Sequence, residues 1–595
     1  MAGNGLNPVS SDSGWRASLK TGWLLATVAC TAILLPDFIL RDLGGRVLTK
    51  GDLLIHFNWA VQVHRALLEG VFYPRWMPKA NAGLGEPVFL YYPPLYHLVS
   101  SYLTPLFGSV WRGMEAVTFI SRFIAGLIVF AICRGGRLSL LWSVIGTVLV
   151  LSAPYSAFLL AYAGALPSSA AILPMLVLLY ATLYPRRDTL LIDPWVSLSV
   201  AWLSMVHVLT AFMVLLCFPV LPVVLSWRRT HSVQAVGRSL ARWILSSLLG
   251  LGVAAIYLVP ALTQLNLITP SAWWGGGWRA SFSLPFLTQH RFGHQWWVVQ
   301  WPLSLISLCC LVVATIEMWR SRRDNDHESL LRFGFLFVIA GWLAMFLASD
   351  ISYPAWAIFK ILQALQFPSR FLTISSLFGI LANVFCLAII ASRPNILLRK
   401  AFVAAPLVAS FALTAALQIS LFRGVRPVQL KSEVVESVDN QLGRPEYLPA
   451  TTEGKAKNWK QYNKAGGFRA FCSKHDLDCA VLDQRADLMK WRVTSHKSQN
   501  VILPLFAFPA WSLRANGKKI PNPIDPATGL MLAKVSAGVT NISAVWIGLP
   551  IQRTGNWVSL ISLCILAGIA LSQIRLLAGF HRDLTSDSHQ PTHGS

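Results

Sequence analysis

Long apolar runs, separated by short basic loops, make up most of this chain. Taken as helices, they are candidate membrane spans at residues 21–40, 116–133, 139–157, 166–184, 193–206, 207–227, 241–262, 297–319, 331–349, 370–391, 400–421 and 555–577. The adjacent runs 193–206 and 207–227 are predicted to form a hairpin of two short helices, which keeps the basic loops before and after them on one side of the membrane. The pattern predicts a polytopic α-helical membrane protein with about twelve crossings.

One further apolar run, residues 88–108, begins with Tyr-Tyr-Pro-Pro within its first turns, and the sequence leaves open whether it crosses. Basic loops mark the cytoplasmic side of a membrane protein. They lie here at residues 134–137, 185–187, 227–229, 319–323 and 392–400. All of them fall on one side only if 88–108 does not fully cross. If it does cross, 193–227 must form one long helix instead.

The first external loop, residues 41–96, is predicted to contain an amphipathic helix that lies along the membrane interface. Its polar side chains recur at helical spacing at Asn58, Gln62, Arg65 and Glu69. Leu54, Phe57, Val61 and Leu68 line a different face, and Asp52, His56, Trp59 and Val63 share a third. Asp52 also suits the N-cap position of this helix, so a capping role and a chemical role are both open.

The pattern changes to alternating apolar and polar residues between 422 and 553, which predicts a separate external β-domain, a small β-sandwich. Asn516-Gly517 lies between two alternating runs and predicts a type I′ hairpin turn. The resulting division is a cytoplasmic tail at 1–20, a transmembrane domain at 21–421, the β-domain at 422–553, a last span at 554–577 and a polar tail at 578–595.

Composition narrows the function classes. Of 595 residues, 54% are hydrophobic and 13% are charged, against roughly a quarter charged in soluble domains. The net charge of +24 resides largely in the short loops, where it indicates membrane topology and attraction to anionic lipid headgroups. No motif for nucleic-acid binding accompanies it, so we expect membrane lipids, and no nucleic acid, as partners.

Cys472 and Cys479 are the two cysteines outside the apolar segments. An exported domain lies in an oxidising compartment, so these two are predicted to form a disulfide that closes a short loop. The other seven cysteines lie in apolar runs, where a thiol behaves as a small hydrophobic side chain.

Several motifs, in their order along the chain, resemble a known family. GD-LLIHF, EGVFYPRW, GLGEPVFLYYPPLY, LQFPSRFL and, in the β-region, RPEYLP and FPAWSLRANGKK are similar to the YfhO-like bacterial membrane proteins, also labelled 6-pyruvoyl-tetrahydropterin-synthase-related. These proteins are similar to the GT-C class of glycosyltransferases. The resemblance implies a GT-C-like helical bundle, but the sequence has no cluster of His ligands that would support the pterin-synthase label.

The resemblance also implies a catalytic carboxylate in the first external loop, and Asp52 of the GD-xxxH motif occupies the matching place. Such a carboxylate would take the proton of an attacking hydroxyl. Asp42, in a turn before Gly44-Gly45, is the alternative base. His56 lies one helical turn after Asp52, where it would orient that carboxylate or contact a phosphate, or serve only as an interfacial hydrogen-bonding residue.

Arg75 and Arg370 are the candidates for binding a phosphate, because each follows a proline at a predicted membrane boundary and arginine can bind phosphate in a bidentate way. Arginines that extend toward the headgroups are the alternative explanation. His207, at the tip of the predicted hairpin 193–227, is a further candidate. The residues indicate no metal site, and the use of a divalent cation is left open.

Together these features predict a multi-pass glycosyltransferase of the bacterial cytoplasmic (inner) membrane, with its site and β-domain on the external, periplasmic side. Nucleotide sugars are absent there, so the sugar donor would be a polyprenyl phosphate and the acceptor an external glycan, lipid or polymer. A lipid-linked glycan transporter, a non-catalytic assembly factor and a receptor of the cell envelope are the alternatives.

The basic loops generate a topology prediction. A cysteine placed at Lys518 should react with an impermeant maleimide in intact cells, whereas cysteines at Arg187, Arg229 and Arg322 should react only after the membrane is broken. A residue-518 cysteine that stays protected in intact cells would overturn this topology.

Overall fold

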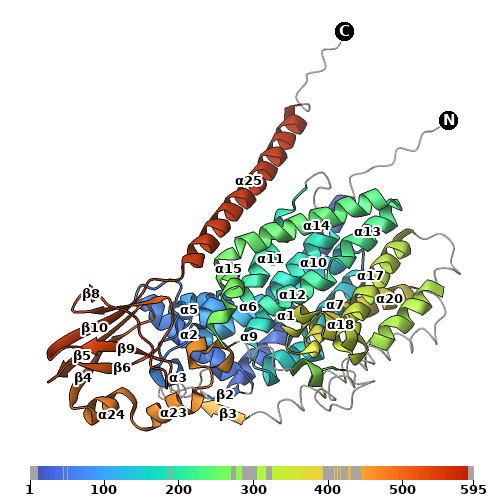
Figure 1. Ribbon diagram of the computed structural model, residues 1–595. Helices are drawn as coiled ribbons and strands as arrows, with labels where there is room; N and C mark the ends of the chain where they lie inside the picture. The colour runs from blue at the N-terminus through green and yellow to red at the C-terminus, as the bar shows by residue number, and fades with distance from the viewer. Residues whose placement is uncertain are drawn as a thin grey trace, which may run out of the picture.

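The computed structural model describes residues 11–43, 46–49, 51–185, 191–269, 277–283, 304–316, 325–392, 408, 412, 416, 426–429 and 444–586. Helices form most of it, and a group of β-strands occupies the lower left of Figure 1, beside the bundle. Helix α25 begins next to these strands and runs away from them along the bundle (Figure 1).

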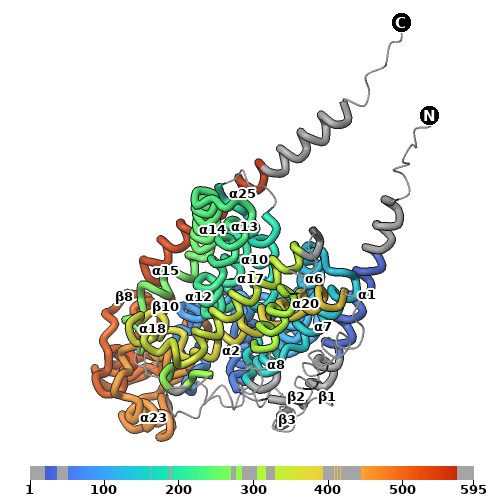
Figure 2. The backbone as a smooth tube through the Cα atoms, turned by 90° about the vertical axis from the view of Figure 1, so that its right-hand side faces the viewer, coloured from blue at the N-terminus to red at the C-terminus, as the bar shows by residue number. Residues whose placement is uncertain are grey.

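The helices of the bundle differ widely in length. They are α1 (Ser11–Arg41), α6 (Val110–Gly135), α7 (Leu140–Leu151), α8 (Pro154–Ala157), α9 (Leu166–Ala170), α10 (Ile172–Leu183), α11 (Pro194–Val206), α12 (Val208–Cys217), α13 (Val220–Thr230), α14 (Val233–Val253), α15 (Ala255–Thr263), α17 (Asn325–Ala348), α18 (Tyr353–Ile358), α19 (Lys360–Gln363), α20 (Leu372–Ala391) and α25 (Pro550–Ser586). Helix α20 packs along α17, on the right-hand side of the bundle in Figure 1, and the two also lie side by side in Figure 2.

Within the described residues, seven helical stretches are long and apolar enough to cross a membrane, or eight if one bent pair counts as a single span. The seven are Val110–Gly135, Leu140–Leu160, Leu166–Leu183, Val208–Thr230, Glu328–Ala348, Pro368–Ala391 and Pro550–Ser572. Each overlaps a predicted span, so the chain is a multi-pass membrane protein by the length and composition of its helices.

The remaining predicted spans have different outcomes. The span 241–262 is broken, since α14 and α15 meet at an angle of 83°. Three runs form shorter apolar helices, Lys20–Leu35, Pro194–Val206 and Ser304–Ile316. Nearly all of 400–421 lies outside the described residues, and the total of about twelve spans therefore stays a prediction.

The run 88–108, which the sequence left open, forms two short helices, α4 (Val88–Tyr91) and α5 (Leu95–Phe107). Pro93 and Pro94 separate them, because proline lacks the N–H that would continue the helix. A 13-residue helix such as α5 extends about 20 Å, short of the roughly 30 Å of a bilayer core. As a single helix, α5 is therefore too short to cross a bilayer core.

Helix α2 (Leu53–Leu68) of the first external loop is buried on more sides than its pattern predicted. Asn58 and Gln62, expected on a solvent face, are 1% and 3% exposed, whereas Leu68 of the expected apolar face is 75% exposed. The polar stripe is therefore packed inside the protein, and the position of α2 along a membrane interface stays a prediction. Gln62 donates to Asn58 Oδ1 at 3.1 Å and accepts from the Lys79 backbone N–H at 3.0 Å, whereas Asn58 Nδ2 has no hydrogen-bond partner among the described residues.

The strands form three sheets. A five-stranded antiparallel sheet has the order β4 (Leu477–Gln484), β5 (Leu488–Ser495), β10 (Gly538–Trp546), β7 (Trp511–Ala515) and β8 (Lys518–Lys519). Strands β6 (Gln499–Phe506) and β9 (Leu530–Val535) form a second, two-stranded sheet. The third joins distant parts of the chain, with the order β1 (Asp42–Leu43), β2 (Arg46–Thr49) and β3 (Arg426–Gln429).

The five- and two-stranded sheets enclose one apolar core, but a sandwich of two comparable sheets is not confirmed. This core continues into the first external loop. Trp76, which is fully buried, lies with its ring centroid 5.6 Å from Trp511 and 5.8 Å from both Phe508 and Trp546. The loop and the β-strands are therefore one packing unit, with the short helix α3 (Ala80–Gly83) between them.

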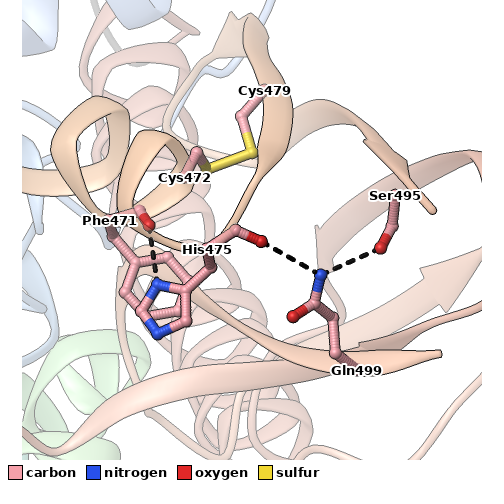
Figure 3. Close-up of a disulfide and its surroundings, with 6 residues drawn as sticks. All are labelled: Phe471, Cys472, His475, Cys479, Ser495 and Gln499. Carbon is pink, nitrogen blue, oxygen red and sulfur yellow. Dashed lines mark hydrogen bonds between the residues drawn. A yellow bond between two sulfur atoms is a disulfide. The ribbon is translucent and has the colours of Figure 1, made fainter. Parts of the chain in front are cut away.

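Two short helices, α23 (Ala456–Lys464) and α24 (Gly467–Lys474), precede the strands. The predicted disulfide between Cys472 and Cys479 is confirmed and ties the end of α24 to β4 (Figure 3). Gln499 of β6 donates to the His475 carbonyl at 3.4 Å and to Ser495 Oγ at 3.0 Å, which holds the loop between the two cysteines against the sheet (Figure 3).

The predicted hairpin at Asn516-Gly517 is also confirmed. Both residues have positive φ, 47° and 81°, as a type I′ turn requires, and they connect β7 to β8. A Cβ on Gly517 would meet no atom within 4 Å, so a substitution there tests the backbone conformation alone.

We expect Gly517→Val to lower the free energy of unfolding by about 1 kcal/mol or more, since a β-branched residue resists positive φ. Gly237→Val is the matched control, because Gly237 has open space around it but lies in helix α14 at negative φ. Melting temperatures of the purified variants measure the effect. Equal melting of the Gly517→Val variant and the wild type would contradict the turn assignment.

Candidate active site

A cavity of about 610 Å³ lies where the first external loop, the bundle and the segment before the β-strands meet. Its acidic, basic and histidine lining residues are Asp52, His56, His207, Arg370, Arg444 and Glu446. Four of these six side chains were predicted from sequence. They come from regions of the chain hundreds of residues apart, so only the tertiary fold brings them together.

Asp52 is placed by a close backbone contact. Its N–H donates to the Ala163 carbonyl at 2.8 Å, directly after a π-helical turn at Phe158–Tyr162. The preceding Gly51 has φ +64°, and a Cβ there would lie 2.1 Å from the same carbonyl oxygen. Only glycine permits this approach, which fixes the start of α2 and the carboxylate at its first turn.

Asp52 occupies the N-cap position of α2, but its side chain makes no capping hydrogen bond. The carboxylate instead forms an ion pair with the guanidinium of Arg444. Both side chains are partly exposed, Asp52 at 53% and Arg444 at 30%, so water and a ligand can reach the pair. The capping role that the sequence left open for Asp52 is not observed.

His56 lies one turn beyond Asp52 and is buried, with no hydrogen-bond partner for its Nδ1 atom. Its ring lies 5.3 Å from the ring of His97 and 5.5 Å from that of Trp59. Burial lowers the pKa of His56 to about 4, while nearby Asp52 raises it and Arg444 lowers it. At neutral pH the imidazole is therefore uncharged and can offer either a donor or an acceptor to a polar group.

Arg370 extends from the start of the span Pro368–Ala391 into the cavity. Its Nη1 donates to the Leu365 carbonyl at 2.7 Å, its Nη2 contacts Gln366 Oε1 at 3.4 Å, and its guanidinium lies 4.9 Å from the ring of Phe367. Across the part of the chain that the structure describes, no ion pair involves Arg370. Its close contacts in the described residues are thus with neutral groups, although the Asp52 carboxylate acts on its charge within the same cavity.

His207 marks the break between α11 and α12, as the predicted hairpin tip required. Its ring nitrogens lie 2.8 Å from Ser168 Oγ and 2.7 Å from Thr210 Oγ1. Both nitrogens are thus engaged within the protein. His207 shapes the wall of the cavity rather than presenting an unused nitrogen to it.

Arg444 and Glu446, which sequence reasoning did not select, belong to the segment 444–449, the RPEYLP motif. The backbone N–H of Arg444 donates to Glu86 Oε2 at 3.2 Å, and Asn81 donates to the same oxygen at 3.1 Å. RPEYLP was one of the motifs that carried the family resemblance, and that was the available signal. No local periodicity marks its two charged side chains as part of the site.

Tyr92 lies near three charged side chains of the cavity, Asp52, Arg370 and Arg444. Burial raises the pKa of Tyr92; Asp52 raises it further, whereas Arg370 and Arg444 lower it. One acid and two arginines therefore surround a single tyrosine that lines the cavity. Such an arrangement can bind an anion while keeping a carboxylate within the same site.

Of the two other predicted site residues, Arg75 is not among the cavity's lining residues, and the side chain of Asp42 cannot be placed relative to it. Arg75 is buried, donates to the Ile256 carbonyl at 3.1 Å and lies 3.5 Å over the ring of Tyr73, so it joins the first loop to α15. Asp42 lies in the short strand β1 opposite Val47, and its side chain is outside the described residues. Within the described ranges, no group of three or more His, Cys, Asp and Glu residues is arranged to hold a metal ion.

Comparison with known proteins does not assign this chain to a family. No protein-family model matches the chain, and no curated protein matches it, so the resemblance to the YfhO-like proteins is not confirmed. Among solved structures, the arabinofuranosyltransferase AftD from mycobacteria is similar over 66% of this chain, at 15% identity and a TM-score of 0.38. The match covers 27% of the AftD chain, so this chain spans about a quarter of its length. We infer no activity from a likeness of this size.

Glu86 generates a prediction for stability against pH. Burial raises its pKa from 4.5 to about 8, although Asn81 and the Arg444 N–H lower it. Between these values the folded protein keeps a proton that the unfolded chain has released, so stability should fall as pH rises through this window. Glu86→Gln, which mimics the protonated acid, should remove that slope.

The measurement is the melting temperature of the purified full chain from pH 5 to pH 9. Between pH 5 and pH 9, the melting temperature of Glu86→Gln should fall by at least about 2 °C less than that of the wild type. Glu453→Gln, at an exposed glutamate of the same region, should follow the wild type. Parallel curves for Glu86→Gln and the wild type would contradict the assignment.

Proposed function

We propose that this protein is an integral membrane glycosyltransferase that moves a sugar from a polyprenyl-phosphate donor to an external glycan, lipid or polymer. The observation that carries the proposal is the cavity itself. It places the Asp52 carboxylate and the Arg370 guanidinium, which has no acidic partner in the described residues, in one site at the end of a membrane bundle.

In the proposed reaction the acceptor hydroxyl attacks the anomeric carbon of the donor sugar. The new bond joins the acceptor oxygen to that carbon, and the bond from the same carbon to the donor phosphate oxygen breaks. Asp52 takes the hydroxyl proton, and the polyprenyl phosphate leaves with the bonding electron pair. A positioned carboxylate is a suitable base for this step, because it shares the site with the acceptor and is open to it.

The leaving phosphate needs a cation, and Arg370 is suited to supply it. Charge that develops on a leaving group is stabilised most by donors that are already in place. Leu365, Gln366 and Phe367 hold the Arg370 side chain without neutralising it. Its position at the first turn of a predicted span would set the phosphate at the level of the headgroups.

The apolar part of the lining supports a lipid donor. The cavity wall includes Phe158, Leu159, Leu209, Met213 and Phe367 beside the charged groups. A site that must hold both an isoprenoid chain and a sugar needs this combination of surfaces. The expected external location comes from the basic loops of the sequence, and the segment 444–449 and the β-strands would share that side.

The first variants to test are at Asp52. Asp52→Asn keeps the size of the side chain but removes the proton acceptor, so donor binding should not weaken while turnover falls at least about a hundredfold. Binding and turnover are measured separately on purified protein with a polyprenyl-phosphate sugar. Asp478→Asn, at an exposed acid of β4, should leave both unchanged. If Asp52→Asn turns over normally, Asp42 becomes the base to test. If substituting neither acid lowers turnover, a lipid-linked glycan transporter is favoured.

Arg370 should behave differently from Asp52. Arg370→Lys keeps a charge but loses the bidentate grip, and Arg370→Ala loses both, so activity and donor binding should fall together in the order wild type, Lys, Ala. We expect about tenfold or more for the alanine variant, the scale of one charge-assisted contact. Arg514→Ala, at an exposed arginine of β7, is the control. Unchanged donor binding in Arg370→Ala would remove this residue from the phosphate site.

A further inference from the structure

Arg444 makes two contacts that point in different directions. Its guanidinium pairs with Asp52, and its backbone N–H donates to the buried carboxyl group of Glu86. The side chain therefore faces the cavity mouth, while the main chain is held by the first external loop. The main chain of Arg444 is therefore anchored independently of the contact that its charged side chain makes.

The main chain around Arg444 is held at further points. Tyr447 is buried, with its ring 5.9 Å from Trp59 and 6.3 Å from Tyr92. The Leu448 carbonyl accepts from both the backbone N–H and the hydroxyl of Thr269, at 2.9 and 3.1 Å. The segment 444–449 is thus a fixed wall of the site. The Arg444 side chain, 30% exposed, is the part that can turn.

The ion pair conflicts with the role proposed for Asp52. The guanidinium contacts Asp52 Oδ1 and so occupies one of the two carboxylate oxygens that would accept the hydroxyl proton. The same guanidinium is a good ligand for phosphate, which carries more charge than one carboxylate and can be bound by two parallel hydrogen bonds. A donor phosphate near Arg370 would therefore compete with Asp52 for Arg444.

We propose that Arg444 is a second phosphate-binding residue that exchanges partners: it holds Asp52 when the cavity is empty and turns to the donor phosphate when the donor binds. The exchange leaves the Asp52 carboxylate available as the base only when the donor is in place. This inference rests on the proposed function and extends it to an order of binding, donor before acceptor activation.

The test is a double-mutant cycle on the binding of a polyprenyl phosphate that carries no sugar, so that no turnover occurs. Asp52→Asn removes the competing partner of Arg444 and should tighten binding by about threefold to fivefold, the range for a partly exposed ion pair. In an Arg444→Ala background the same Asp52→Asn change should no longer tighten binding. In an Arg444→Lys background, which keeps a charge at the wall, a smaller tightening should remain.

Glu446 supplies the matched control, because it is another acid that lines the cavity. Any tightening by Glu446→Gln reflects general repulsion of the phosphate and should be equal in the wild-type and Arg444→Ala backgrounds. A polyprenol of the same length without the phosphate should bind equally to all variants. Melting temperatures confirm that each variant is folded.

Two results would overturn the exchange. One is that Asp52→Asn binds the polyprenyl phosphate no more tightly than the wild type does. The other is that Asp52→Asn tightens binding just as much in the Arg444→Ala background. Either result leaves the glycosyltransferase proposal standing, provided that Asp52→Asn still loses turnover. Failure of the wild-type protein to bind the polyprenyl phosphate more tightly than the polyprenol would instead remove the donor, and with it both proposals.

Discussion

Helix α2 is buried between two apolar cores, and the arrangement of the site depends on that constraint. Leu53, Phe57 and Ala60 pack into the core of the helical bundle, whereas Ile55 and Trp59 pack into the core shared with the β-strands. Burial of both faces removes apolar surface from water along most of the helix, the dominant favourable term in folding. Because α2 cannot shift toward either side, the carboxylate at its first turn has a defined position.

The Asp52–Arg444 ion pair of the site is partly exposed, and neutral polar groups are buried near it. Asp52 and Arg444 are partly exposed, but His56 and Glu86 directly behind them are buried. Burial favours the uncharged forms of both the imidazole and the carboxyl group. A layer of neutral donors and acceptors can thus anchor the wall and the helix without adding charge that would compete for an anion in the cavity.

Local features of the fold could be predicted from sequence, whereas features set by tertiary contact could not. The turn at Asn516-Gly517 and the disulfide Cys472–Cys479 depend on neighbouring residues and compartment, and both were predicted. The burial of Asn58 was missed, because a polar stripe indicates solvent only when no other polar group is packed against it. Arg444 was missed for a related reason: its partner Asp52 lies in another part of the chain, and no spacing rule relates the two residues. Of the four predicted residues that line the cavity, Asp52 and His56 came from the GD-xxxH motif of the resemblance, Arg370 from a membrane boundary and His207 from a hairpin tip. None of these signals says what a side chain contacts.

The long sequence separation between residues that contact each other has a consequence for biosynthesis. Asp52 and Arg444 are 392 residues apart, and strand β2 of the first loop finds its partner β3 only when residues 426–429 have emerged. At about 5–20 residues per second, the ribosome adds the intervening chain in roughly 20 to 80 s. During that interval Trp76 and the inner face of α2 have no β-core to enter, although the spans around them are already being inserted. Until the β-strands are made, the loop 41–96 is only partly packed. Its exposed aromatic surface would have to be covered by a chaperone or by lipid headgroups.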